Sequence, residues 1–333
     1  MITISLCMIV KDEERVLKRC LDSLCDLVDE IIIVDTGSKD NTKKIARQYT
    51  DNIYDYKWED DFSKARNYSF SKATKDYIYC ADADEILDET NRKRLKDLKK
   101  SLLPEIDIVQ MKYCNQLEHN TVYNFDKEYR PKLYKRIREF RFKEPIHEAV
   151  VLEPVVYDSD IEIIHKPLES HASRDLLSFY NHFHKDPTKL SKRLHNMYAK
   201  ELFISGTDKD FLDAEVIFEQ TSKDENRSLD EIKEACIVLS HIFRIKNDIY
   251  NFFKYTIKDL VTNSCSEICY ELGKFYYDNK DYDEAIVWFY NAKYETESIL
   301  CINYGHEKPL IGLSEAYKKL GNMEKCKEYL GQI

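Results

Sequence analysis

The first 90 residues alternate between short apolar runs and segments in which apolar residues recur every three or four positions. Residues 3–10, 30–35 and 77–81 are nearly continuous in apolar character, which is typical of central strands covered on both faces. Residues 52–56 form a shorter strand. The segments between these runs have the periodicity of amphipathic helices. This alternation of strands and helices predicts a mostly parallel sheet with helices on both faces, and such sheets bind ligands at the carboxyl ends of their strands.

The elements after these runs are also predicted from their patterns. Asp12 is the expected N-cap of the first helix, because acidic residues and then an apolar stripe follow it. Residues 91–103 have the pattern of another amphipathic helix. Residues 105–113 and 161–166 read as further strands, the second of which ends close to His165.

The chain changes character after residue 175, where strand patterns give way to helical periodicity. We therefore predict two domains, 1–172 and 173–333. Residues 266–296 carry small and apolar residues at the offsets of a tetratricopeptide repeat, and a second copy begins at residue 307. Stacked repeats bury a shared aromatic stripe, so the stripe is core by default. A concave groove that holds a peptide is the functional interpretation.

Composition narrows the class of partner. The chain has 333 residues, a formal charge of −10 and 43% hydrophobic residues. This acidity argues against a general binder of nucleic acid or anionic membranes, which depends on clustered positive charge. The ten cysteines are scattered without a Cys-x-x-Cys pair, as in a reduced protein of the cytoplasm. No apolar run reaches the length of a membrane span, so a cytoplasmic location without a membrane span is expected.

Three acidic residues lie at the ends of two of the predicted strands. Asp35 follows the second strand, and Asp82 and Asp84 follow the fourth at i and i+2 spacing, which places both on one side of an extended chain. Carboxylates with this spacing suit Mg²⁺ or Mn²⁺, whose remaining ligands are commonly phosphate oxygens and water. A solvated acidic loop is the alternative interpretation. Only Gly37 lies in the first 205 residues, so a glycine-rich phosphate loop is excluded there.

Four segments together resemble the family 2 glycosyltransferases, in the order and spacing of that family. They are residues 8–14 (MIVKDEE), 32–42 (IIVDTGSKDNT), 61–67 (DFSKARN) and 81–85 (ADADE). The resemblance implies a GT-A fold, which is a Rossmann-like mixed α/β sheet with helices on both faces. It also implies a UDP-sugar donor, a divalent cation (Mg²⁺ or Mn²⁺) and transfer with inversion at the anomeric carbon.

The resemblance also implies the residues of the donor site. Asp35 corresponds to the acid that binds the edge of the nucleobase, with Ile9, Val10 and Glu14 as the wall beneath base and ribose. A helix-capping role is the alternative for Asp35. Arg66 and Asn67 correspond to an Ala-Arg-Asn element near the base or diphosphate, where a guanidinium suits oxyanions. A surface ion pair is the alternative for Arg66.

The metal ligands and the catalytic base follow from the same resemblance. Asp84 is the expected direct metal ligand, Asp82 contacts the ribose or the metal, and His165 completes the metal site or is a structural histidine. An inverting transfer needs a base for the acceptor proton. Glu148 is the candidate, and His147 either orients the acceptor or is itself the base. A hydrogen-bonded structural pair is the alternative for His147 and Glu148.

The combination of this domain with C-terminal repeats resembles the S-glycosyltransferases that modify glycocin bacteriocins. It implies transfer to a cysteine or serine of a peptide or protein held by the helical repeats. Transfer to a saccharide or lipid-linked acceptor is an alternative within the class. Alternatives of another class are a nucleotidyltransferase and a non-catalytic adaptor that binds protein through its repeats. The sequence leaves the oligomeric state open, and a homodimer is one alternative.

Overall fold

The computed structural model describes residues 1–114, 127–138, 140, 142–143, 149–150, 154–166, 172–260 and 264–333. The chain divides into two compact units, Met1–Ser170 and His171–Ile333. This division differs by two residues from the predicted boundary at residue 172. The predicted catalytic residues His147 and Glu148 lie outside the described residues.

The first unit is an α/β unit. Its strands are β1 (Ile4–Val10), β2 (Glu30–Asp35), β3 (Ile53–Asp55), β4 (Tyr77–Cys80), β5 (Glu85–Ile86), β6 (Ile108–Cys114), β7 (Lys127–Lys135), β8 (Phe142–Lys143), β9 (Ala149–Val150) and β10 (Val156–His165). Its helices are α1 (Leu17–Leu24), α2 (Thr42–Ala46), α3 (Phe62–Ser71), α4 (Glu89–Ser101) and the 3-10 turn η2 (Arg136–Arg138).

Eight strands form one mixed sheet in the order β3-β2-β1-β4-β7-β6-β10-β5, and β8 pairs with β9 in a small second sheet. The first four strands of this order are parallel to one another. Strand β7 is antiparallel to both of its neighbours, and β5 is antiparallel to β10. The carboxyl ends of β2, β1 and β4 therefore meet at one edge, which collects the predicted donor residues.

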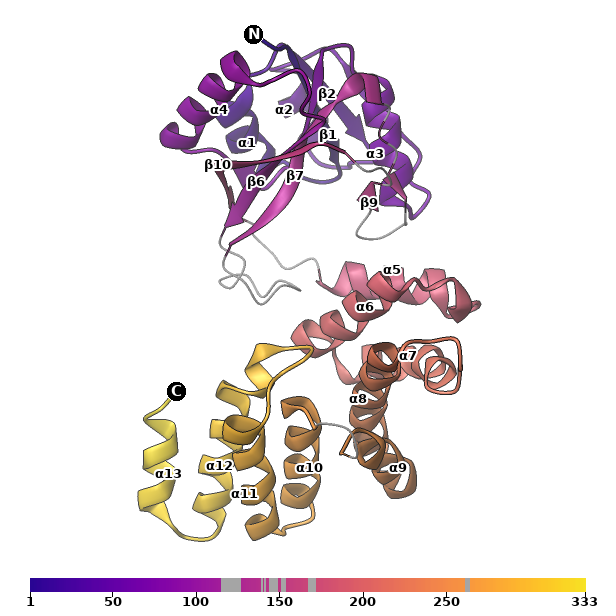
Figure 1. Cartoon of the computed structure of the whole chain (residues 1–333), viewed down its shortest axis with the longest axis vertical. Helices are drawn as coiled ribbons and strands as arrows, with labels where there is room; N and C mark the ends of the chain where they lie inside the picture. The colour runs from indigo at the N-terminus through magenta and orange to yellow at the C-terminus, as the bar shows by residue number, and fades with distance from the viewer. Residues whose placement is uncertain are drawn as a thin grey trace. The chain divides into compact units, whose positions relative to one another are not determined.

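Both faces of the sheet are covered, which explains why the central strands are nearly continuous in apolar character. On one face, side chains of β1 pack against α1, α2 and α4. On the other face, neighbouring side chains pack against α3 and β8, and Figure 1 shows α1, α2 and α4 on the side of the sheet opposite α3. The first cluster includes Ile4, Leu6, Met8, Leu17, Leu21, Ala46 and Leu95, and the second includes Cys7, Ile32, Phe70, Ile78 and Phe142. The predicted α/β sheet with helices on both faces is confirmed.

The prediction that Asp12 caps the first helix is wrong. Helix α1 begins at Leu17, and Val16 precedes it without a side-chain cap. Asp12 has a φ of 56°, outside the extended conformation of an N-cap residue. Its carboxylate instead accepts a hydrogen bond from the backbone N–H of Lys39 at 2.7 Å. A contact across 27 residues therefore replaces the local cap.

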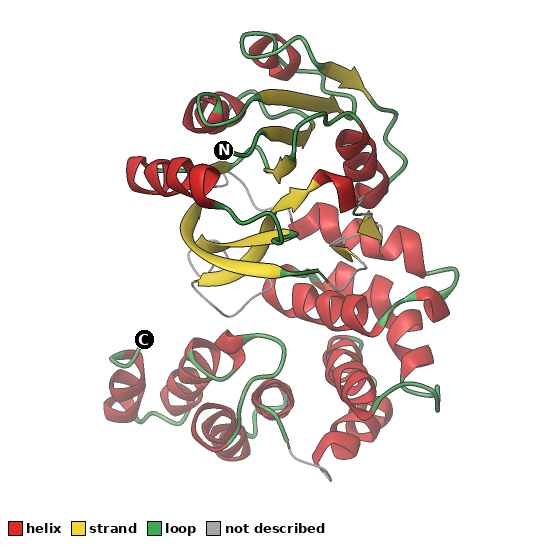
Figure 2. Ribbon diagram, turned by 45° about the horizontal axis from the view of Figure 1, so that its top comes forward, coloured by secondary structure: helices red, strands yellow, loops and turns green. Residues whose placement is uncertain are grey.

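The second unit consists of stacked helices. They are α5 (Ala172–Phe183), α6 (Lys192–Ser205), α7 (Asp208–Thr221), α8 (Leu229–Ile245), α9 (Ile249–Leu260), α10 (Ser266–Asp278), α11 (Tyr282–Tyr290), α12 (Glu307–Lys319) and α13 (Met323–Leu330), with short turns η3 (Pro187–Lys189), η4 (Asn291–Glu295) and η5 (Ile302–Tyr304). Figure 2 shows helices joined by loops through this unit, and its described residues contain no strand. The all-α second half is thus confirmed.

One aromatic ring fills the space between three helices of the C-terminal repeats. Phe289 of α11 is fully buried in a cluster with Leu310 and Leu313 of α12. A Cβ atom at Gly273 would lie 2.6 Å from this ring, and one at Gly312 would lie 2.8 Å from it. Both helices approach the ring closely because these positions lack a side chain.

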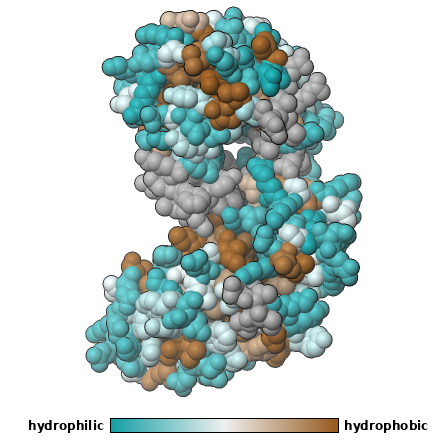
Figure 3. Space-filling model, viewed as in Figure 1, coloured by the Kyte–Doolittle hydropathy of each residue, from teal (hydrophilic) through white to brown (hydrophobic). Residues whose placement is uncertain are grey.

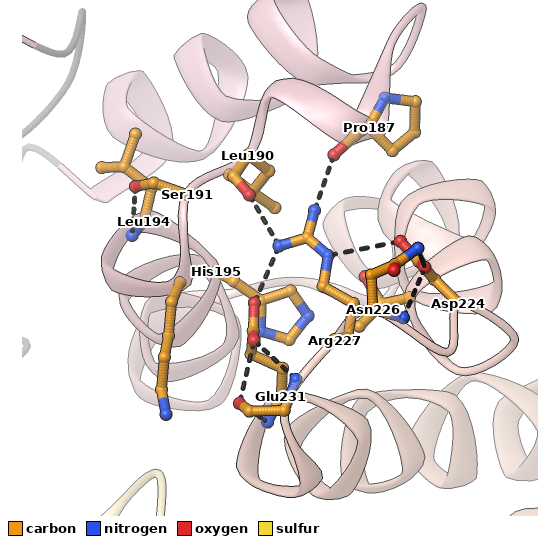
Figure 4. A network of polar contacts seen from close by, with 12 residues as sticks. Pro187, Leu190, Ser191, Leu194, His195, Asp224, Asn226, Arg227 and Glu231 are labelled. Atoms are coloured by element: carbon orange, nitrogen blue, oxygen red, sulfur yellow. Dashed lines mark hydrogen bonds and ion pairs between the residues drawn. The ribbon is translucent and has the colours of Figure 1, made fainter.

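A partly buried arginine joins two earlier segments of the second unit. Arg227 donates from Nη1 to the carbonyl of Leu190 and to Glu231 Oε1, each at 2.7 Å, and from Nη2 to the carbonyl of Pro187 at 3.1 Å (Figure 4). Glu231 also forms a capping box with Ser228 at the start of α8. The charge of Arg227 is therefore balanced, and the segment before α6 is tied to α8.

A buried carboxyl group in α6 predicts a pH-dependent stability. Burial raises the pKa of Glu201, which is 4% exposed, to about 7, and the hydrogen bond from Ser205 Oγ at 2.7 Å offsets part of this effect. The folded state thus favours the protonated form. The contribution of the Glu201 carboxyl group to stability is complete below its unfolded-state pKa of 4.5. This contribution is lost as the pH rises through about 7, the pKa in the folded state.

Glu201→Gln should therefore gain stability relative to the wild type as the pH rises from 4.5 to 8, by about 3 kcal/mol in total. Urea unfolding of both proteins at several pH values measures this difference. Glu225→Gln removes a carboxylate from an exposed position and is the matched control. A wild-type and Glu201→Gln difference that stays constant with pH would contradict the prediction.

The surface agrees with the acidic composition. Figure 3 shows hydrophilic residues over most of the visible face, with small hydrophobic patches between them. Within the described ranges, no helix combines the length and the apolar character needed to cross a bilayer.

Candidate active site

Two loops at the carboxyl edge of the sheet are joined by hydrogen bonds in both directions. The loop after β1 donates the backbone N–H groups of Asp12 to Ser38 Oγ (2.9 Å) and of Glu13 to Thr42 Oγ1 (2.7 Å). In return, Asp12 Oδ1 accepts from the N–H of Lys39 at 2.7 Å. These contacts hold the two loops in place beside the carboxyl ends of β1 and β2.

The predicted wall residues lie at this edge. Ile9 and Val10 end β1, with Val10 3% exposed. Glu14 Oε2 accepts from the backbone and side-chain amides of Asn41 at 2.9 and 2.8 Å, so this carboxylate stabilises the start of α2. A donor contact for Ile9, Val10 and Glu14 remains a prediction.

Asp35 at the end of β2 has two carboxylate oxygens in different surroundings. Oδ1 accepts from the backbone N–H groups of Gly37 (3.0 Å) and Ser38 (2.9 Å), and Lys43 Nζ lies 3.6 Å from it. Oδ2 is buried and accepts no hydrogen bond from any described residue. An unpaired buried acceptor costs free energy, so Oδ2 is suited to a donor group on a ligand.

Arg66 and Asp82 form an ion pair between α3 and the end of β4. Arg66 Nη2 lies 3.4 Å from Asp82 Oδ1, and Arg66 Nη1 donates to Cys80 Sγ. Desolvation favours the protonated form of Asp82. The cations Arg66 and Lys132 outweigh this effect and hold the pKa of its carboxyl well below the ordinary value. Asp82 is therefore ionised at neutral pH, with Arg66 as its partner.

Asp84 and His165 face each other where β5 pairs with β10. His165 pairs with Glu85 in the antiparallel register, and the N–H of Lys166 donates to the carbonyl of Asp84 at 3.0 Å. His165 Nε2 lies 2.9 Å from Asp84 Oδ2. The predicted pair thus comes together from positions 81 residues apart.

The Asp84 and His165 side chains fit a divalent cation, because a carboxylate oxygen and an imidazole nitrogen are ordinary ligands of such ions. Among the residues that the structure describes, no group of three or more His, Cys, Asp and Glu side chains forms a metal site. Asp82 is directed to Arg66 rather than to the Asp84–His165 pair. A cation at this pair would therefore take further ligands from a diphosphate and water.

Asn67 joins α3 to the backbone of β8. Its Nδ2 donates to the carbonyl of Phe142 at 2.9 Å, and its Oδ1 accepts from the N–H of Phe142 at 2.8 Å. This reciprocal pair attaches β8 to α3. The predicted contact of Asn67 with the donor remains a prediction, and the contacts with Phe142 give it a structural role.

A buried ion pair beneath the metal-ligand candidates was not predicted. Lys132 of β7 donates from Nζ to Glu85 Oε1, and the two residues are 5% and 2% exposed. Burial raises the pKa of the Glu85 carboxyl above its ordinary value, and Lys132 opposes this effect. The sequence offers one signal, which is a lysine beside the apolar pair Leu133 and Tyr134. The partner depends on the pairing of β7 with β4, which no local pattern contains.

The two units match two separate family models. Residues 5–151 match the family described as glycosyl transferase family 2, and residues 266–294 and 308–333 match the tetratricopeptide repeat. The predicted resemblance to family 2 glycosyltransferases with C-terminal repeats is confirmed.

The curated proteins that are similar to part of the chain include the following two. A TPR repeat-containing protein of Synechococcus elongatus is 36% identical over 152 residues, which are 45% of this chain and 36% of that protein. The SPbeta prophage-derived glycosyltransferase SunS of Bacillus subtilis is 33% identical over 165 residues, which are 48% of this chain and 36% of that protein. The aligned part thus spans little more than a third of the length of each relative.

A chain from Mycobacterium tuberculosis is among the similar solved structures. It is glucosyl-3-phosphoglycerate synthase in complex with Mn²⁺ and UDP-glucose, at a TM-score of 0.41 and 14% identity. The similarity covers 54% of this chain and 76% of that chain.

Proposed function

We propose that residues 5–151, which form a family 2 glycosyltransferase domain, transfer a sugar from a UDP-sugar to a cysteine or serine side chain of a peptide or protein. The observation that carries this proposal is Asp35 Oδ2, a buried acceptor without a described partner at the carboxyl edge of the sheet. The imide N–H of uracil is a donor that would satisfy it. A carboxylate can thus select the base without a glycine-rich loop.

The donor would extend along this edge from β2 towards β4. Arg66 lies beside Asp82, and its guanidinium supports binding of ribose or diphosphate oxygens. Asp84 and His165 would hold Mg²⁺ or Mn²⁺, which supplies positive charge to the leaving diphosphate when bound. His147 or Glu148 would take the acceptor proton opposite the leaving group, as an inverting transfer requires.

The acceptor proposal rests on the repeats and on the similarity to SunS. Tetratricopeptide repeats stack their helices into a continuous surface, and such surfaces suit extended peptides. The ten free cysteines support a reducing compartment, and we place the activity in the cytoplasm.

Calorimetric titration with UDP, with and without Mn²⁺, tests the donor site. Metal-dependent binding of UDP supports the proposal, and absence of binding in the presence of Mn²⁺ rejects it. Separate incubations, one with UDP-glucose and one with UTP and a sugar phosphate, then distinguish two reaction classes. Release of UDP supports glycosyl transfer, whereas release of pyrophosphate from UTP and a sugar phosphate would indicate a nucleotidyltransferase.

A further inference from the structure

We propose that the Lys43 ammonium donates a hydrogen bond to the O4 carbonyl of the uracil base. This contact gives the site its preference for uracil over cytosine. This inference rests on the proposed function, because it concerns the base of the same nucleotide. It assigns to Lys43 of α2 a contact that neither the family motifs nor the strand-end carboxylates indicate.

Lys43 is held beside the carboxylate of Asp35. Its Nζ forms an ion pair with Asp55 Oδ1 and lies 3.6 Å from Asp35 Oδ1. Asp35 and Asp55 are opposite each other in the parallel register of β2 and β3. The Lys43 side chain is 32% exposed, whereas that of Asp35 is 0% exposed. The Lys43 ammonium group therefore lies at the solvent-exposed side of the site, and the Asp35 carboxylate lies at its buried side.

The contacts of the two groups leave one donor and one acceptor for a ligand. Gly37 and Ser38 donate to Asp35 Oδ1, which fixes the carboxylate and leaves Oδ2 for the base. An ammonium group has three N–H donors. Asp55 and Asp35 are the two described acceptors near Lys43, so a third N–H is left for a carbonyl oxygen. The bond with Asp55 raises the pKa of Lys43, which keeps it charged at neutral pH.

The acceptor Asp35 Oδ2 and the donor Lys43 Nζ together are complementary to uracil but not to cytosine. Uracil presents its N3–H next to the O4 carbonyl, so Asp35 accepts and Lys43 donates. Cytosine presents an unprotonated N3 next to an amino group. Its N3 would face the Asp35 carboxylate and its amino group would face the Lys43 ammonium, so both contacts would be repulsive.

The strand order decides between the two carbonyls of uracil. The sheet runs β3-β2-β1-β4, with Asp35 on β2 and with Asp82 following β4. The ribose and diphosphate therefore extend from β2 towards β4, and the edge of the base far from the ribose points towards β3. The anchor of Lys43 is Asp55 on β3. O4 is the carbonyl far from the ribose, whereas O2 lies beside the glycosidic bond.

Calorimetric titration of the full chain with UDP and with CDP, in the presence of Mn²⁺, tests this inference. The wild type should bind UDP at least 100-fold more tightly than CDP. Lys43→Met should weaken UDP binding about tenfold and should not weaken CDP binding, because it removes the repulsion between the ammonium and the cytosine amino group, so the preference falls by about tenfold or more. Lys44→Met, in which an exposed lysine of the same helix is changed, is the matched control and should keep the wild-type preference.

Two results overturn the inference and leave the donor site intact. One is a UDP affinity of Lys43→Met equal to that of the wild type. The other is an equal loss for UDP and CDP, which would restrict Lys43 to balancing the charge of Asp35. A wild type that binds neither nucleotide rejects the proposed function together with this inference. Circular dichroism confirms that each variant is folded before titration.

Discussion

Asp35→Asn is expected to bind UDP about 100-fold more weakly than the wild type. The backbone N–H groups of Gly37 and Ser38 both donate to Asp35 Oδ1. In the variant they would hold the amide oxygen at that position, so the NH₂ group would occupy the position of Oδ2. A donor would then face the N3–H of uracil, and a charged hydrogen bond would be lost, an effect of about 3 kcal/mol.

The measurement is calorimetric titration with UDP in the presence of Mn²⁺. Asp51→Asn changes an exposed aspartate between α2 and β3 in the same way and should bind UDP like the wild type. Asp35→Asn should remain folded, because the amide oxygen keeps the two backbone hydrogen bonds of the loop. An affinity for UDP within threefold of the wild type would show that Oδ2 does not contact the base.

Asp84→Ala and His165→Ala should each remove the effect of Mn²⁺ on UDP binding. The two side chains lie 2.9 Å apart, and each variant leaves a single protein ligand at this position. Loss of a group that only supports a metal ligand typically weakens metal binding by 10- to 100-fold, so loss of a ligand should cost about 100-fold or more. Binding of UDP by the variants should equal that of the wild type after chelation of the metal.

Titration with UDP at several Mn²⁺ concentrations measures this effect. Glu89→Ala removes a carboxylate that is 94% exposed at the start of α4 and should leave the metal dependence unchanged. Asp82→Asn should have a smaller effect on the metal dependence than Asp84→Ala, because Asp82 is paired with Arg66. Unchanged metal dependence in both Asp84→Ala and His165→Ala would exclude this pair as the metal ligands.

The central strands β1, β2 and β4 were predictable because each one buries both faces. Continuous apolar runs such as residues 30–35 can be satisfied only in the middle of a covered sheet, so local composition determines the element. The start of α1 was not predictable in this way. The residues around Asp12 match a capping pattern, but the hydrogen bond from Lys39 holds Asp12 at a positive φ. No window of sequence around residue 12 contains that partner.

The same distinction separates the predicted and the missed residues of the site. Asp35, Asp84 and His165 are predictable because they follow strands, and topology brings strand ends to one edge. Lys43 and Lys132 lie inside a helix and a strand, where no local pattern identifies their partners. Their roles come from acidic partners on other elements, Asp55 for Lys43 and Glu85 for Lys132.

The repeats were predictable where their spacing is regular. The predicted repeat at 266–296 corresponds to the family match at 266–294, and the second copy begins at 307 against a match from 308. Their small residues are required by the Phe289 ring, which Gly273 and Gly312 approach from two helices. In the earlier helices, polar contacts such as those of Arg227 also hold neighbouring segments together. Such contacts produce no periodic pattern in the sequence.

The hydrogen bonds between the loops after β1 and β2 have a consequence for the speed of nucleotide capture. Asp12, Glu13 and Glu14 are each bound to the loop of residues 38–42, so the ordering of both loops is completed when the chain folds. A nucleotide that arrives at this edge meets groups already in position and loses little conformational entropy of the protein. Association should therefore follow a single exponential whose rate rises linearly with nucleotide concentration, without the plateau that a slow closing step imposes.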